Sequence, residues 1–273
     1  MQDSGASGRS TLGKTVISVA AALVFSFAAR AQTSAPQQSD SPKMHKAGPA
    51  PRRDLTGIWD VANTMEGISP QGVKSHAPFT AWGVDIANNV YKPGDGPRRV
   101  PIAHVNDPLD SCDPAGFPRN LLFELRPFHV VQTPDQVLML YQYQRTWRAI
   151  WTDGRELPKD PDPSWYGYSV GKWVDDYTFV VETVGLDERT WLDNAGDPHS
   201  SELRVEERYV RLDHDNLELT VKIDDPKAYT APWLARDKLH LTLRPPKTEI
   251  MEMICAPSEA EAYKKTIAEP ATK

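Results

Sequence analysis

The sequence has few of the residues on which metal centres and common enzyme classes depend. It contains only two cysteines, and its seven histidines show neither the H-x-H nor the H-x3-H spacing that is typical of metal ligands. It also contains no G-x-S-x-G motif, no phosphate-binding loop and no dinucleotide-binding fingerprint. We therefore expect no bound metal and no cofactor, and the sequence does not support a metalloenzyme, serine hydrolase, kinase or dehydrogenase.

The sequence also lacks an excess of basic residues and a long apolar run. Its formal net charge is −6, and without residues 1–31, which hold three basic residues and one acidic residue, the charge becomes −8. Nucleic acids and anionic membranes attract basic patches, and a membrane-spanning helix needs about 20 apolar residues. We therefore expect a small-molecule partner, no nucleic acid and no membrane span. The sequence does not indicate an oligomeric state.

The start of the chain has the features of a secretory signal at residues 1–31. A basic beginning is followed by an apolar run of 14 residues, 15–28, and by the small-x-small pattern at 29–31, which predicts cleavage at that point. Residues 32–53 are rich in Pro, Ser, Gln and Ala and predict a disordered tether, because they offer little apolar surface to bury. We expect the mature protein in the periplasm or outside the cell.

The two cysteines, Cys112 and Cys255, are expected to form a disulfide in such a compartment. Two lone cysteines are more often bridged there than free or metal-bound. The bridge would tie the irregular front of the domain to its last expected strand. Closing so long a loop contributes roughly 4 to 5 kcal/mol on the chain-entropy model, so its expected role is structural.

The second half of the chain predicts a succession of short strands separated by turn signals. Leu217, Leu219 and Val221 alternate with polar residues, as in a half-buried antiparallel strand. Eight or more such strands without a βαβ rhythm favour an all-β fold, a single antiparallel up-and-down β-barrel. The expected strands are 55–62, 128–133, 137–143, 146–152, 168–174, 177–184, 203–213, 217–224, 238–244 and 249–254.

The boundaries of this domain are expected at 54–263, with a flexible tail at 264–273. Residues 64–120 are rich in Pro and Gly and predict a long irregular N-terminal region that wraps the barrel or covers one mouth. A weak helical pattern covers 258–268. The Gly57-x-Trp59 triplet in the first expected strand resembles the opening of lipocalin-like (calycin) barrels.

Several longer motifs resemble a large family of secreted bacterial proteins that is frequent in soil bacteria. The resemblance covers most of residues 55–257 and implies relatives rather than a reaction, because the family brings no established activity and no catalytic residue to carry over. The motifs are "CDPAGFPR" (112–119), "QTPDQVLMLYQYQRTWRAIWTDGRELP" (132–158), "WYGYSVGKWVDDYTFVVETVG" (165–185), "TWLDNAGDPHSSELRVEERY" (190–209) and "IDDPKAYTAPW" (223–233).

The loop at 190–202 offers a candidate acid–base group. A neutral His199 beside a carboxylate such as Asp193, in a partly buried barrel mouth, would transfer protons near pH 7. The alternative is structural: residues 193–196 form a tight turn, and His199 and Ser200 cap the next segment. Both interpretations remain open at the level of sequence.

The strand that follows carries charges on both faces. Its apolar character changes sides near Glu206 and Glu207, which predicts a β-bulge and would turn Glu207 or Arg208 into the barrel. A charge in that position must be paired or belong to a site. The alternative is an exposed ladder of alternating charges.

Aromatic residues supply the candidate ligand contacts. Trp147 and Trp151 share one face of a strand beside Arg148, and rings at a barrel mouth next to an arginine suit a planar or hydrophobic ligand. The same rings would otherwise simply fill the core. The full set of expected ligand-binding residues is Trp147, Arg148, Trp151, Trp191, Tyr229 and Trp233.

These residues lead to three hypotheses about function. The first is a secreted β-barrel that binds a small apolar or aromatic molecule in its mouth. The second is a cofactor-free lyase, isomerase or hydratase, with His199 as acid or base, Asp193 or Glu207 orienting it, and Arg148 or Arg208 holding an anionic intermediate. The third is a structural or interaction module of the cell envelope. The first two require His199 to share one hollow with the indoles.

Overall fold

The computed structural model describes residues 47–62, 77–123 and 125–270. The expected signal sequence and residues 32–46 of the expected tether lie outside these ranges. Residues 47–53, the end of the expected tether, lie along the domain. The backbone N–H of Arg53 donates to Asp176 over 2.7 Å, and the N–H of His214 donates to Gly48 over 3.0 Å.

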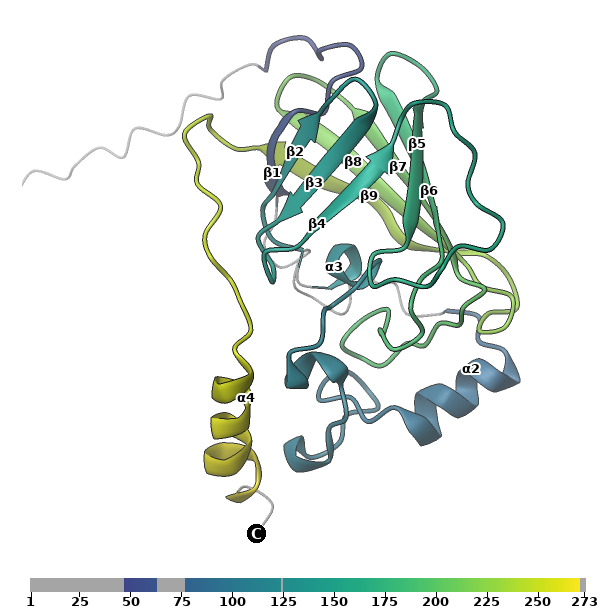
Figure 1. Ribbon diagram of the computed structural model, residues 1–273, viewed down its shortest axis with the longest axis vertical. Helices are drawn as coiled ribbons and strands as arrows, with labels where there is room; N and C mark the ends of the chain where they lie inside the picture. Colours follow the sequence, from purple (N-terminus) through teal and green to yellow (C-terminus); the bar gives the residue numbers. More distant parts are fainter. Residues whose placement is uncertain (1–46, 63–76, 124, 271–273) are drawn as a thin grey trace, which may run out of the picture. The chain divides into compact units, whose positions relative to one another are not determined.

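Nine strands form a closed barrel in which each strand pairs with the next along the chain and the last returns to the first (Figure 1). The expected all-β barrel is therefore confirmed. The strands are β1 (Gly57–Val61), β2 (Phe128–Gln132), β3 (Gln136–Tyr141), β4 (Trp147–Trp151), β5 (Tyr168–Trp173), β6 (Thr178–Val184), β7 (Arg204–Arg211), β8 (Asn216–Asp224) and β9 (Trp233–Leu243).

One pair of strands departs from the expected antiparallel pattern. β4 and β5 run parallel and share only the pairs Ile150–Ser169 and Trp151–Val170. Residues 152–167 therefore cross back from the end of β4 to the start of β5, because parallel neighbours need a long connection. The barrel is mixed, with this one short parallel seam.

The barrel closes at a different point from the one expected. Residues 249–254 form no strand, apart from a single bridge between Met253 and Tyr143. β9 instead pairs with β1, for example Trp59 with Leu243. The Pro245-Pro246 pair that follows β9 explains its end, since proline cannot donate to a sheet ladder.

Side chains fill the interior of the barrel. In β8, Leu217, Leu219, Val221 and Ile223 are fully buried, whereas the residues between them are only partly buried, so the predicted alternation is confirmed. Large rings from other strands complete the core, including Trp59 and several Phe and Tyr side chains. These side chains form one buried cluster inside the barrel.

The β-bulge expected in β7 is not present, and that prediction is wrong. β7 pairs in unbroken register with β6 from Val205 to Val210 and with β8 from Arg204 to Arg211. The register shift lies instead between β8 and β9, around Leu219 and Val221. β7 keeps the same face inward along its whole length. The apolar residues of its sequence shift from one face to the other because charged residues occupy some of the inward positions.

The long irregular region closes one end of the barrel with the segment Ala115–Leu122, here called the plug. Phe117, Leu121 and Leu122 belong to the buried core, and Arg236 of β9 donates to the Leu122 carbonyl over 2.6 Å. Figure 1 shows α3 at the lower ends of the strands. The helices of this region are α2 (Ala81–Asp85), η2 (Ile86–Val90), η3 (Ile102–His104), η4 (Pro108–Ser111) and α3 (Arg119–Leu122).

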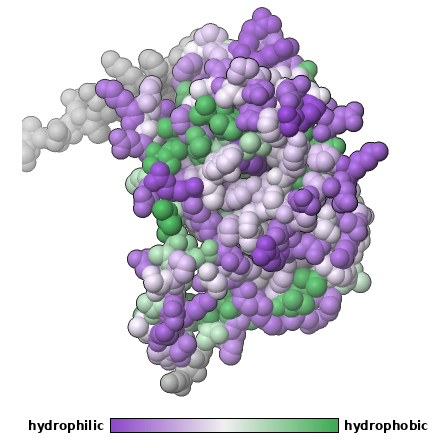
Figure 2. Space-filling model, in the orientation of Figure 1, coloured by the Kyte–Doolittle hydropathy of each residue, from purple (hydrophilic) through white to green (hydrophobic). Residues whose placement is uncertain are grey.

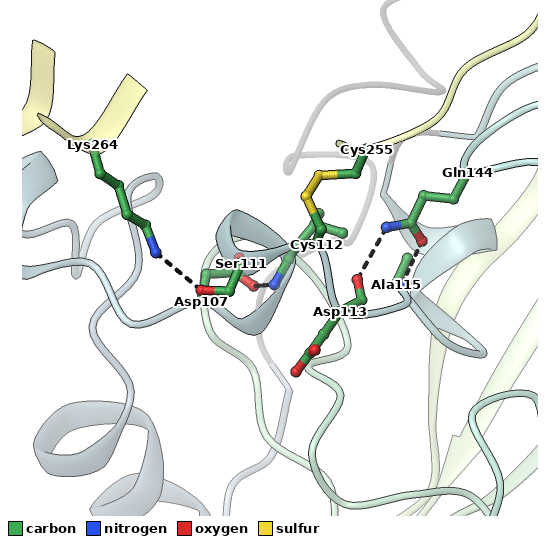
Figure 3. Close-up of a disulfide and its surroundings, with 9 residues drawn as sticks. Asp107, Ser111, Cys112, Asp113, Ala115, Gln144, Cys255 and Lys264 are labelled. Atoms are coloured by element: carbon green, nitrogen blue, oxygen red, sulfur yellow. Dashed lines mark hydrogen bonds between the residues drawn. A yellow bond between two sulfur atoms is a disulfide. The ribbon is translucent and has the colours of Figure 1, made fainter. Parts of the chain in front are cut away.

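The C-terminal part of the chain is attached to the irregular region by the expected disulfide. Cys112 and Cys255 are bonded over 2.01 Å, and beside them Gln144 accepts from Ala115 and donates to Asp113 (Figure 3). The helices α4 (Pro257–Tyr263) and η5 (Lys264–Ala268) follow. The expected flexible tail therefore begins as a helix through residue 268.

Candidate functional site

Two of the predicted site residues, Arg148 and Glu207, meet inside the barrel. The alternation of β4 and β7 turns both side chains inward, and both are buried. Arg148 Nη2 lies 2.5 Å from Glu207 Oε2, and the Tyr209 hydroxyl donates to Glu207 Oε1 over 2.5 Å. The Arg148 guanidinium also lies 4.0 Å from the centre of the Phe117 ring in the plug.

The environment of Arg148 keeps its guanidinium charged. Burial lowers the pKa of Arg148, but the neighbouring Glu207 carboxylate and the hydroxyls of Tyr141 and Tyr209 outweigh burial and raise that pKa above its usual value. Burial, followed by the charge of Glu207, raises the pKa of Tyr209 well above its ordinary range. Tyr209 therefore remains a neutral hydroxyl that donates its proton in the hydrogen bond to Glu207. The pair joins β4 to β7 inside the barrel and lies against the plug.

Five other predicted residues gather in a buried cluster at the plugged end of the barrel. The Tyr229 hydroxyl donates to the carbonyl of Pro198 over 2.7 Å, which places the loop before β9 against the residue that precedes His199. The rings of Tyr229 and Trp233 lie 5.3 Å apart. The cluster consists of Trp191, Asp193, His199, Tyr229 and Trp233, of which all but Trp233 are almost fully buried.

His199 is held by two hydrogen bonds and is 1% exposed. Its Nδ1 lies 3.2 Å from the carbonyl oxygen of Ser200 and its Nε2 lies 2.6 Å from the Thr190 hydroxyl. Because a carbonyl only accepts, Nδ1 carries the proton and Nε2 accepts from Thr190. Burial lowers the pKa of His199. This arrangement matches a structural histidine rather than a free acid or base, and Asp193 does not orient it.

Asp193 forms a tight turn, which was the structural alternative to its role beside a catalytic His199. Its Oδ1 accepts from the backbone N–H groups of Ala195 over 2.9 Å and Asp197 over 3.1 Å. Burial and then the charge of Asp197 raise the pKa of Asp193 to about 7. A carboxyl with this pKa holds a proton over much of the physiological range, although hydrogen bonds to backbone N–H groups favour its ionised form.

Two ion pairs around this cluster were missed by sequence reasoning. Arg119 in the plug forms a two-pronged pair with Asp107, with N–O distances of 2.8 and 2.5 Å, and its guanidinium lies 5.8 Å from the centre of the Trp191 ring. Arg98 lies 2.6 Å from Asp197. Arg119 stands in the "CDPAGFPR" motif, but nothing in the local pattern indicates that its partner lies 12 residues earlier.

The remaining predicted residues, Trp147, Trp151 and Arg208, lie on the outer wall. Trp147 is 62% exposed, Trp151 is partly exposed and is covered by the Arg155 guanidinium at 3.5 Å, and Arg208 is exposed. β4 turns Arg148 and not the indoles inward. The structure therefore does not bring Trp147 and Trp151 into one hollow with the buried His199.

An apolar cleft lies elsewhere, between η3, η4 and the C-terminal helices, and is here called the C-terminal cleft. Its volume is about 530 Å³, within the range of small-molecule sites. Three of its apolar side chains are strongly exposed: Ile254 at 59%, Tyr263 at 48% and Ile102 at 43%. Others that line it are Val105, Leu109 and Ala260. Figure 2 shows apolar patches on the side of the view along which the C-terminal segment runs.

Three charged residues line this cleft, Asp110, Glu259 and Lys264. Burial, and then the charge of Asp107, raises the pKa of Asp110 above its usual value. Lys264, on η5, donates from Nζ to the Ser111 hydroxyl over 3.0 Å. The cleft thus combines an apolar surface with two carboxyl groups and one ammonium group, while Cys255 of the disulfide forms part of its wall.

Comparisons of this chain with protein-family models, with curated proteins and with solved structures found no match. The resemblance to secreted bacterial proteins therefore stays a prediction.

Within the described ranges, no three His, Cys, Asp or Glu side chains are grouped so that they could hold a metal ion, and no helix there is long and apolar enough to cross a bilayer. The fold and its clefts define the molecule as a nine-stranded β-barrel with hollows on its surface.

Proposed function

We propose that the protein binds a small apolar or aromatic molecule in the C-terminal cleft. The observation that carries this proposal is a hollow of about 530 Å³ whose rim exposes Ile102, Ile254 and Tyr263 to water. Covering apolar surface is favourable by about 25 cal/mol per Å². These side chains stay exposed in the folded protein, so a ligand that covers them gains binding energy.

The charged groups of the cleft give the ligand an orientation. Asp110 and Lys264 both line the hollow, and a few polar groups in an apolar site select for a matching polar group on the ligand. A ring system with one hydrogen-bonding or anionic substituent satisfies both requirements. His199 does not enter this proposal, because both of its ring nitrogens are engaged in hydrogen bonds.

The disulfide supports both the site and the location of the protein. The bond between Cys112 and Cys255 holds one wall of the cleft next to η4, so that the site is arranged before the ligand arrives, which reduces the entropy cost of binding. Disulfides persist in oxidising compartments. We accordingly propose that the protein acts in the periplasm or outside the cell.

The test is to fill the cleft with a side chain of the protein itself. Ala260→Trp places an indole from α4 in the hollow, whereas Ala262→Trp adds the same ring at an exposed position of the same helix that does not line the cleft. Binding is measured on the full chain with its disulfide intact. The probe is anilinonaphthalene sulfonate, an aromatic anion, which is titrated while its fluorescence is excited directly.

We expect Ala260→Trp to weaken probe binding by about tenfold or more and Ala262→Trp to leave it unchanged. Far-ultraviolet circular dichroism verifies that both variants keep the barrel. Equal binding by the parent and both variants would show that the probe sits elsewhere and would remove the proposal, as would a parent protein that binds no probe.

A further inference from the structure

A second hollow runs over the outer wall of the barrel beneath the β4–β5 connection. It consists of three adjoining hollows of about 330, 130 and 430 Å³. The first and second share Leu157 and Glu182, and the second and third share Val184, Arg204 and Asp224. The shared lining residues place the three hollows side by side, and together they are here called the outer-wall groove.

The floor of the groove is built by outward side chains of β5 to β8. One row of cross-strand partners reads Val170, Glu182, Glu206 and Lys222. Four neighbouring strands span three spacings of about 4.8 Å, so this row is roughly 14 Å wide. This row therefore presents one valine and three charged side chains along an extended floor.

The β4–β5 connection forms the wall of the groove and is fixed in place. Leu157, Lys159 and Pro161 of this segment line it. The backbone N–H of Ser164 donates to Gly185 over 3.0 Å, and Asp187 donates to Ser164 over 3.1 Å, so the connection is tied to the end of β6. The groove is thus a formed feature of the fold.

The charges of the groove nearly cancel. Six acidic and five basic residues line its three hollows, and one exposed pair, Glu206 and Lys222, lies 3.6 Å apart. A balanced surface creates little net field to attract a polyanion or a polycation. It does present many hydrogen-bond donors and acceptors side by side, which suits a neutral ligand with many hydroxyl groups.

An aromatic surface adjoins one end of the groove. Arg155, which lines the groove, lies over Trp151 and donates to the Tyr168 hydroxyl over 3.0 Å. Four residues earlier on the same face of β4, Trp147 is 62% exposed. Exposed aromatic rings pack against the C–H faces of sugar rings.

A peptide strand fits this groove less well. Peptides that bind sheets add to an exposed edge through main-chain hydrogen bonds, whereas β6 and β7 are each paired on both sides. Only side chains are available on the floor. We propose that the outer-wall groove is a second binding site, independent of the C-terminal cleft, and that it takes a neutral oligosaccharide chain.

The experiment compares groove variants with a matched control on the same strand. Arg204→Ala and Glu182→Ala each remove a side chain shared by two of the three hollows. Arg208→Ala removes the same type of side chain from the same exposed face of β7, but at a position that lines none of the three hollows. The probes are hexasaccharides of glucose, mannose and xylose, measured by isothermal titration on the full chain, with an oligogalacturonate as the acidic comparison.

We expect at least one neutral hexasaccharide to bind, and Arg204→Ala and Glu182→Ala to weaken it by about threefold to tenfold, the value of one or two hydrogen bonds. Arg208→Ala should leave affinity unchanged. All three substitutions are at exposed or half-exposed positions, and thermal melting verifies that folding is intact. No binding of any neutral probe, preference for the acidic chain, or equal loss in Arg208→Ala would overturn the proposal.

Discussion

Arg148 and Glu207 show how a charged pair is accommodated inside a β-barrel. Removing two charges from water costs several kcal/mol per ion, and mutual attraction offsets this cost only with close geometry and further hydrogen bonds. The pair has a 2.5 Å contact, a second donor to the carboxylate from Tyr209 and an aromatic ring over the guanidinium. Each residue is therefore tolerated only while the other is present.

Replacing one partner should consequently be far more costly than the contact alone suggests. We expect Glu207→Gln to lower the free energy of unfolding by about 3 to 5 kcal/mol, because Arg148 would be left as an uncompensated buried charge. Urea unfolding at neutral pH measures this change. Glu206→Gln is the matched control on the same strand, since Glu206 faces outward and has only an exposed lysine partner, and it should cost under about 1 kcal/mol.

A second variant separates charge from packing. If Glu207→Gln acts through the stranded guanidinium, adding Arg148→Met should restore part of the lost stability. Equal stability of Glu207→Gln and Glu206→Gln would contradict this account of the barrel interior, and failure of the double variant to recover would place the cost in the hydrogen bond from Tyr209 instead.

The orientation of β4 explains why the site could be predicted only in part. In "WRAIW", hydrophobicity favours turning Trp147, Ala149 and Trp151 inward, yet the structure buries Arg148 and Ile150. The reason is Glu207, which lies 59 residues later and neutralises the inward arginine. A pattern within one strand contains no information about such a distant partner, so the sequence identified Glu207 as a possible inward charge but placed the indoles on the wrong face.

At the scale of elements, regular alternation was predictable and connections were not. β8 follows its sequence pattern, because each inward position is apolar. The β4–β5 connection was not recognised, since Asp153-Gly154 resembles a hairpin turn, although the chain continues to residue 167 before β5 begins. The disulfide was predictable because only two cysteines exist.

The C-terminal helices should depend on that disulfide for their position. α4 has no buried residue, and the exposed Arg145–Glu252 pair at 3.1 Å contributes at most about 1 kcal/mol. We expect trypsin to cleave the double variant Cys112→Ser/Cys255→Ser after Lys264 and Lys265 about tenfold faster than the parent. A tenfold change corresponds to a loss of about 1.4 kcal/mol in the free energy that holds the helices in place. Fragments identified by mass spectrometry measure the rate.

The barrel itself should remain folded in that variant, although with about 2 to 5 kcal/mol less stability. Glu252→Gln serves as the control and should not change the cleavage rate. Cleavage within β6 to β8 at the same time as the C-terminal cuts would argue instead that the bridge holds the whole domain together.

At the scale of the whole molecule, the strength of strand pairing is uneven around the barrel. β7 and β8 share eight paired positions, whereas β4 and β5 share two. Closure removes exposed edges only if every seam holds. The parallel seam is therefore the place where the barrel opens with the loss of the fewest hydrogen bonds, and it adjoins the connection that walls the outer-wall groove.

Hydrogen exchange should reveal this unevenness. We expect peptides from 147–151 and 168–173 to exchange well before peptides from 204–224 under conditions in which exchange reports the opening equilibrium, because local openings span free energies from near zero up to that of global unfolding. The measurement is mass spectrometry of peptic fragments. Exchange of all these peptides together would indicate a barrel that opens only as a whole. Because the groove lies against this seam, a bound neutral oligosaccharide should slow exchange at 168–173, which links the motion of the fold to occupation of its outer wall.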